Sequence, residues 1–212
     1  MRRQLLRFSS SIALLLVPVV AHAQSKFEGS ITMALMAADG TTEISYLIRG
    51  DQMRFNMPRG GGMDGYVVRD ARKNTTMVVM PSQRMYMDLS ALQAMMPGAS
   101  EQAAKTPDIK ITGKKETIAG FECEHVIVAA PDGQYDVCGA KGLGSFSPGS
   151  PMSRGNSGPG LDRLGKDFFP LKVQKVGGGV AMQVTKIEKK SLEASTFAVS
   201  EGFQKMEMPG RP

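Results

Sequence analysis

Apolar and polar positions alternate with a period of two along most of the chain, and turn-forming residues interrupt this alternation about every ten residues. Ile44, Tyr46 and Ile48, for example, fall on one face of a strand. This spacing is typical of an antiparallel sandwich or barrel. Eleven strands are expected, at residues 27–37, 41–49, 53–57, 65–69, 75–80, 84–88, 108–115, 121–130, 134–138, 169–176 and 180–188.

One stretch has a helical rather than a strand pattern. Residues 89–96 are rich in strong helix formers, and Pro97-Gly98 stops them. The residue pattern therefore predicts a mainly β protein with one or two short helices.

The N-terminal segment has the three parts of a secretory signal peptide. Arg2, Arg3 and Arg7 form a positive region, residues 12–20 are apolar, and Ala21-His22-Ala23 is a small-x-small cleavage site. The apolar run is shorter than the roughly 20 residues that span a bilayer. We expect residues 1–23 to be cleaved after Ala23, and residues 24–212 to reach the periplasm without a transmembrane segment.

Composition narrows the class of partner. The 212 residues are 42% hydrophobic and 22% charged, with no Trp and 16 Met. Without the leader, 23 basic residues face 20 acidic ones, so the net charge of +6 falls to about +3. The basic residues are scattered and form no stripe that could follow a phosphate backbone, so nucleic-acid binding is not expected.

Residues 139–160 differ from the rest of the chain, because fifteen of these 22 residues are Gly, Ser or Pro. Such a segment buries too little to offset its ordering entropy. It predicts a flexible insertion within one β-rich domain, residues 24–212, and a mobile lid over a cavity is the alternative.

Motifs for catalysis are incomplete. Residues 160–166 fit the start of a phosphate-binding loop, but Asp167 stands where that motif needs Ser or Thr. Residues 145–149 only approximate the nucleophile elbow. His125 is the one histidine outside the leader, and we expect it to be neutral and hydrogen-bonded in or near the core. No enzyme, catalytic residue, cofactor or metal site is therefore predicted.

Cys123 and Cys138 are the only two cysteines, and an oxidising compartment favours a disulfide between them. They lie on neighbouring strands around a Pro131-Asp132-Gly133 turn. A tight turn would place Cys123 opposite a residue near 141, so direct opposition of the two cysteines needs a bulge or a longer loop.

The methionines allow three interpretations. They could fill the core, bind Cu(I) through their soft sulfur atoms, or line a site that adapts to varied apolar ligands. They are spread over the whole chain rather than concentrated in M-x-x-M repeats, which weakens the copper interpretation.

Several segments, taken in order, resemble an uncharacterised secreted bacterial family that is known only as a domain of unknown function. The resemblance covers about residues 26–205. Its segments are residues 46–54, 117–123, 169–172 and 184–188, followed by Phe197 and Gly202-Phe203.

That family resembles the periplasmic lipoprotein carriers and the outer-membrane lipoprotein-sorting proteins. The resemblance implies a curved antiparallel sheet or incomplete barrel, with helices on the concave side, where acyl chains bind. We therefore expect a monomeric binding protein that holds a lipid or other apolar ligand, with a structural envelope protein as the alternative. The expected contact residues are Met53, Phe55, Met57, Met85, Met87, Met95 and Met96.

Overall fold

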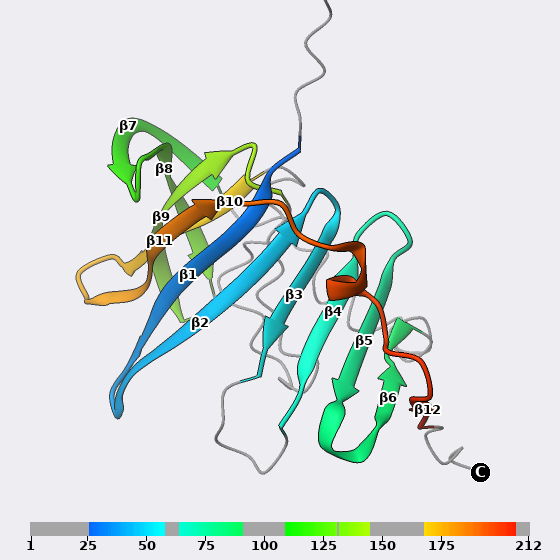
Figure 1. Ribbon diagram of the computed structural model, residues 1–212. Coiled ribbons are helices and arrows are strands. Elements are labelled where there is room, and N and C mark those ends of the chain that lie inside the picture. The colour runs from blue at the N-terminus through cyan, green and yellow to red at the C-terminus, as the bar shows by residue number, and fades with distance from the viewer. Residues whose placement is uncertain (1–25, 58–63, 91–108, 131, 145–167, 207–212) are drawn as a thin grey trace, which may run out of the picture.

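The computed structural model describes residues 26–57, 64–90, 109–130, 132–144 and 168–206 (Figure 1). This part of the chain is built almost entirely from strands. The predicted mainly β fold is confirmed. The strands are β1 Glu28–Ala37, β2 Gly40–Arg49, β3 Gln52–Asn56, β4 Tyr66–Asp70, β5 Thr75–Met80, β6 Met85–Asp88, β7 Ile109–Ile118, β8 Phe121–Ala130, β9 Gly133–Lys141, β10 Phe168–Lys175, β11 Val180–Lys189 and β12 Gln204–Lys205.

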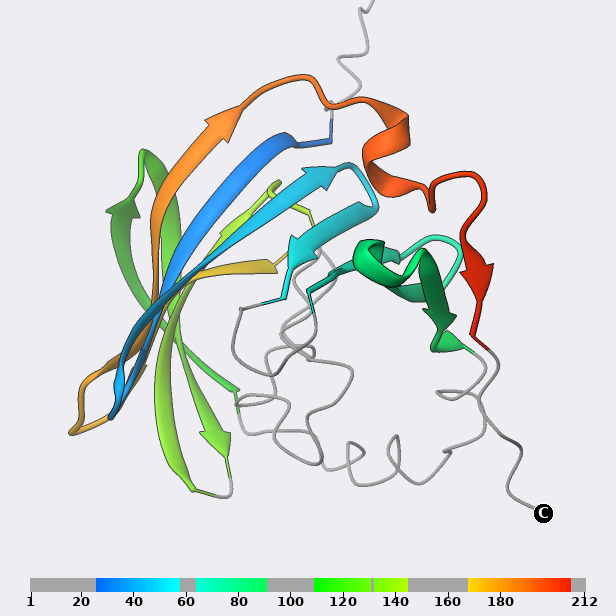
Figure 2. The same cartoon turned by 60° about the horizontal axis from the view of Figure 1, so that its bottom comes forward.

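The twelve strands form one open sheet in the order β12-β6-β5-β4-β3-β2-β1-β11-β10-β9-β8-β7. Every pairing is antiparallel except that of β12 with β6, so the sheet is mixed. It curves strongly but does not close, because β12 and β7 remain as its two edges (Figure 2). Strands β1 to β6 form one meander and strands β7 to β11 form a second. The two meanders join where β1 pairs with β11.

All eleven predicted strands are present, with ends shifted by three residues or fewer. β12 was missed because two residues are too few to show a period. A helical residue appears at Ser90, and the remainder of the predicted helix lies outside the described residues. In the part that the structure describes, the other helical elements are single 3-10 turns, η1 Pro81–Gln83 and η4 Ala194–Phe197.

The inner, concave face of the sheet carries the main core. Register places Ile44 opposite Met33, Tyr46 opposite Phe55, and Val126 opposite Val137 on this one face. Most of these side chains are buried, and they pack with Phe169 and Leu171, which have no exposed surface. Burial of alternate apolar residues across several strands is what the period of two predicted.

The outer face is covered over β3, β4 and β5 by the C-terminal segment. Phe197 of η4 packs on Tyr66, Val68 and Val79, and Arg54 Nη1 donates to the Thr196 carbonyl at 3.1 Å. Figure 2 shows η4 lying across this convex side. The inner face therefore remains the candidate ligand-binding face of this half of the sheet.

Strand β10 contains a proline although it lies between two other strands. Pro170 lies opposite Gly139 and directly beside a register shift of the β9–β10 pairing, and such irregular places are where a sheet tolerates proline.

The first residues of the insertion predicted at 139–160 belong to the sheet and its core rather than to a flexible segment. Strand β9 continues through Lys141, and Leu143 has no exposed surface. These residues pack in the core, so the boundary lies at least a few residues later. Residues 145–160 of the insertion lie outside the described residues. Within the described residues, no helix is long and apolar enough to cross a membrane.

Candidate functional site

Five of the seven predicted contact residues share the inner face. Phe55 lies opposite both Tyr46 and Val67, and Met53 follows on the same face two residues earlier. Val67 in turn lies opposite Val78, and Val78 opposite Met87. Met85 is two residues before Met87 on the same strand and therefore shares its face. Met57 packs with Phe55 and Met87. Met95 and Met96 lie outside the described residues.

These five side chains do not form a single group. Met53 is 5% exposed and belongs to the main core, where it fills space. Phe55, Met57 and Met87 are only partly buried, and they gather over the buried Val67, Val78 and Leu89. Met85 faces the buried Met80 across the β5–β6 pair. A patch of Phe55, Met57, Met85 and Met87, which we call the thioether patch, is therefore the part of the prediction that could contact a ligand.

A small hollow borders Met57 of this patch, but its lining includes Arg54 and Tyr66 of the outer face, and its walls are mainly polar. It has a volume of about 230 Å³, below the roughly 300–1,000 Å³ of typical small-molecule sites. Within it, Arg54 stacks its guanidinium 3.6 Å from the centre of the Tyr66 ring. Its lining is Arg54, Asn56, Met57, Asp64, Gly65, Tyr66 and Pro81.

The predicted disulfide is present between Cys123 of β8 and Cys138 of β9, with Cα atoms 5.3 Å apart. The register places His125, not Cys123, directly opposite Cys138, and the β8–β9 pairing has no bulge. The two cysteines are thus diagonal neighbours on one face. Direct opposition, for which we expected a bulge or a longer loop to be needed, does not occur, and the disulfide forms between diagonal neighbours without either.

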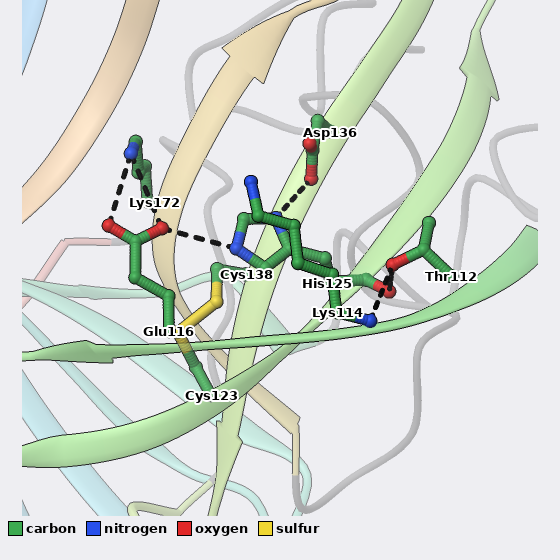
Figure 3. A network of polar contacts seen from close by, with 8 residues as sticks. All are labelled: Thr112, Lys114, Glu116, Cys123, His125, Asp136, Cys138 and Lys172. Carbon is green, nitrogen blue, oxygen red and sulfur yellow. Dashed lines mark hydrogen bonds and ion pairs between the residues drawn. A yellow bond between two sulfur atoms is a disulfide. The ribbon is translucent and has the colours of Figure 1, made fainter.

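Figure 3 shows the disulfide beside a network of charged and polar side chains on β7–β10. The register puts these side chains on the face opposite Val126 and Val137, which is the outer face. His125 Nδ1 lies 2.6 Å from Asp136 Oδ1, and Nε2 lies 3.1 Å from Glu116 Oε2. Lys172 Nζ donates to both carboxylate oxygens of Glu116, at 3.3 and 3.4 Å. The imidazole is 4% exposed, while its three charged neighbours are between 23% and 34% exposed.

Strand register explains this arrangement. Glu116 lies opposite Cys123, and His125 lies opposite Cys138, which in turn lies opposite Lys172. Because alternate residues of a strand share a face, these side chains all point to one side of four adjacent strands.

The network surrounds His125 with carboxylates on both ring nitrogens. Our expectation of a hydrogen-bonded histidine in or near the core is confirmed, because Asp136 lies within hydrogen-bond distance of Nδ1 and Glu116 within that distance of Nε2. Burial alone would raise the pKa of Glu116, yet hydrogen bonds and charge from Lys172 and His125 together hold that pKa below its ordinary value.

Three groups of metal-ligating type meet here. A ring nitrogen of His125, a carboxylate oxygen of Glu116 and the Cys138 sulfur all lie within 4.8 Å of one another. In this state the sulfur is bonded to Cys123 and offers no thiolate. Sequence reasoning missed the cluster because it treated His125 and the cysteines separately. The signal was available, since Cys123 and His125 are two residues apart on a predicted strand.

The two incomplete catalytic motifs, residues 145–149 and 160–166, lie outside the described residues.

Comparison with solved structures supports the fold. The chain is similar to PNGF-II in a C2 crystal form, with a TM-score of 0.50, 13% identity and 85% of this chain covered. PNGF-II in a P21 form gives a TM-score of 0.47, also at 13% identity and with 85% of this chain covered. The chain spans 31% of PNGF-II in both, and at this identity the likeness concerns the fold alone.

No curated protein matches the chain. A sequence model of one family matches residues 27–203, which include nearly every strand of the sheet. The chain therefore belongs to the family described as a domain of unknown function, DUF4412.

Proposed function

We propose that this protein is an exported, non-catalytic binding protein that holds a fatty acyl chain, or a lipid that carries one, against the concave face of its sheet. The observation that carries the proposal is the thioether patch, Phe55, Met57, Met85 and Met87. Phe55 and Met57 lie on β3 and just beyond its end, Met85 and Met87 lie on β6, and all four share one face and remain only partly buried.

The chemistry of the patch suits an apolar and flexible ligand. Thioether side chains are unbranched and polarisable, so they adapt to ligands of varied shape. Beneath them, Val67 and Val78 provide a rigid apolar floor on β4 and β5. The opposite face of these strands is already occupied by Phe197 and its neighbours. A strongly curved sheet also presents a concavity, which is the usual shape of a ligand site.

Resemblance to the lipoprotein carriers supports the same proposal, because an open, curved sheet that holds acyl chains on its concave side is the architecture expected of them. The leader-like residues 1–23 support a place in the periplasm, where lipoproteins need escort. Sequencing the N-terminus of protein secreted by a bacterial host tests this placement. A chain that begins at Gln24 supports it, and an intact Met1 contradicts it.

The binding proposal is tested by titrating the protein with a fluorescent fatty acid. We expect saturable binding by the wild type and by a Met85→Leu/Met87→Leu variant, because these swaps roughly conserve volume and apolar character. A Met85→Gln/Met87→Gln variant should lose affinity by about tenfold or more, since two polar amides must then be desolvated.

Met36→Gln is the matched control, because Met36 is exposed and lies on the other face of β1. It should bind like the wild type. Absence of fatty-acid binding in the wild type would overturn the proposal, as would equal binding by the Met85→Gln/Met87→Gln variant. Tight Cu(I) binding that disappears in the leucine variant, without fatty-acid binding in either, would favour copper handling instead.

A further inference from the structure

We propose that Cys123, Cys138, His125 and Glu116 form a zinc-binding site when the disulfide is reduced, so that the disulfide and the metal are alternative cross-links between β8 and β9, and the metal also joins β7 through Glu116. This site lies on the outer face of β7, β8 and β9, away from the thioether patch, and it is independent of fatty-acid binding.

Geometry supplies the first argument. The four side chains occupy two directly opposite pairs, Glu116 with Cys123 and His125 with Cys138. A ring nitrogen of His125, a Glu116 oxygen and the Cys138 sulfur already lie within 4.8 Å of one another. Ligand atoms of a tetrahedral zinc site are separated by about 3.3–3.8 Å, which follows from metal–ligand distances of about 2.0–2.3 Å. We expect the four ligand atoms to reach the metal through movement of side chains only, because all four residues are on paired strands.

The ligand types supply the second argument. Two thiolates, one imidazole and one carboxylate are a set that Zn²⁺ accepts in tetrahedral geometry. The two thiolates and the carboxylate are negatively charged and neutralise the charge of Zn²⁺, whereas the disulfide is uncharged.

The outer contacts supply the third argument. A metal-binding histidine almost always donates its second N–H to a carboxylate or carbonyl group. His125 Nδ1 already has such a partner in Asp136, at 2.6 Å. This contact directs Nε2 toward Glu116, at 3.1 Å, where the metal would sit between them. Lys172 holds the Glu116 carboxylate from the other side.

The chemical step balances with an external dithiol. The S–S bond between Cys123 and Cys138 breaks by two-electron reduction, the dithiol becomes a disulfide, and two cysteine thiols form. Zn²⁺ then displaces the two thiol protons, together with any proton on Nε2. Re-oxidation by an external disulfide reverses this exchange: the two cysteine thiolates give up two electrons and re-form their S–S bond, the external disulfide is reduced to a dithiol, and the ion is released.

The test uses Co²⁺ as a visible probe of the zinc site. The chain from residue 24 is reduced anaerobically with a dithiol, freed of reductant and titrated. We expect one equivalent of Co²⁺ to give thiolate-to-metal charge-transfer absorption and the ligand-field bands of a tetrahedral ion, both removed by one equivalent of Zn²⁺. The oxidised protein should show neither absorption. Equal binding by the oxidised protein, or no binding by the folded, reduced protein, would overturn the proposal.

Substitutions separate this site from simple thiol binding. Asp136→Asn should weaken Co²⁺ binding about 10- to 100-fold by loss of the histidine's outer partner. Glu116→Gln should weaken binding and change the ligand-field bands. Glu122→Gln is the control, because Glu122 pairs with the exposed Lys115 and is not one of the proposed ligands. This variant should bind Co²⁺ like the wild type. Unchanged binding in both the Asp136 and the Glu116 variants would exclude the proposed ligand set.

A Cys123→Ser variant keeps the experiment decisive if the reduced wild type does not fold. It cannot form the disulfide, and it retains Glu116, His125 and Cys138 as three ligands. Circular dichroism reports whether it is folded. A folded variant should bind Co²⁺ more weakly than the reduced wild type but with a single thiolate band, and absence of that band would overturn the proposal.

Discussion

At the scale of single residues, the outer-face network shows how charged side chains can surround a buried ring without being buried themselves. His125 is 4% exposed, yet Asp136, Glu116 and Lys172 each keep a quarter to a third of their surface in water. The acids thus retain much of their hydration while they satisfy both ring nitrogens. Removal of one member should disturb its neighbours, because the contacts form a continuous chain.

Lys172→Met should weaken the fold in a pH-dependent way. The pKa of Glu116 is lowered in the folded state despite burial, which would raise it, because Lys172 and His125 favour the carboxylate. A lowered pKa contributes stability above the unfolded value of about 4.3, and that stability is lost as the pH falls through the folded pKa. We expect the variant to lose about 1 kcal/mol near pH 6 and to converge with the wild type in strong acid.

Thermal unfolding followed between about pH 2 and pH 7 checks this expectation. Lys186→Met is the control, because Lys186 and Glu188 form a more exposed ion pair and should contribute less. A loss in Lys172→Met that does not change with pH would argue against the ionic origin.

At the scale of elements, the register of the strands could be predicted only in part. Alternation of apolar residues placed eleven strands, and it put Ile44, Tyr46 and Ile48 correctly on a buried face. It could not place β12, whose two residues pair with β6 only because the C-terminal segment returns across the outer face. Nor could it bring Glu116 and Lys172 together, since they are 56 residues apart and meet through the pairings of four strands.

Gly29→Ala should be severely destabilising because of one close approach between strands. A β-carbon at Gly29 of β1 would lie 2.0 Å from the Glu188 carbonyl oxygen of β11. Backbone atoms cannot move aside cheaply, so the central strand pair would have to separate. We expect a loss of about 3 kcal/mol or more, at the upper end of single substitutions.

Denaturant unfolding measures this loss. Gly179→Ala is the matched control, because a β-carbon there meets nothing within 4 Å. The control should change stability by no more than about 0.5 kcal/mol. Similar values for both variants would mean that β1 and β11 are less closely apposed than the structure indicates.

At the scale of the whole molecule, the sequence indicated a single curved sheet through its resemblance rather than through its pattern. Alternation alone fits a sandwich or a barrel equally well, because both bury one face of each strand. The difference depends on strand order and curvature, which arise from pairings between distant segments. The five described residues that we propose for ligand contact share one face of the sheet, because period two fixes the face, but the pattern could not show that Met53 is buried in the core.

Replacement of residues 147–165 by a short Gly-Ser linker should leave the sheet intact. Strands β9 and β10 pair with Phe168 opposite Lys141, so the chain leaves and re-enters the sheet at the same place. A change in loop length alters closure entropy by only about 0.6 kcal/mol per doubling. Leu143 must be kept, because it is fully buried in the core.

Circular dichroism and the melting temperature check the shortened protein. A drop of more than about 5 °C, near 1 kcal/mol or more for a domain of this size, would show that the removed residues stabilise the sheet. An intact fold that no longer binds a fatty acid would instead assign these residues to ligand retention.

The β1–β11 pairing has a consequence for the order of folding. Most other neighbours in the sheet are close in sequence, whereas Ser30 and Glu188, which contact each other across this seam, are 158 residues apart. A chain that emerges N-terminus first must therefore leave one edge of β1 unpaired until nearly all of it has been made. Long-range pairing of this kind slows folding and exposes a strand edge to other chains. Chains that stop before residue 180 should consequently aggregate even though every strand of the first meander is complete.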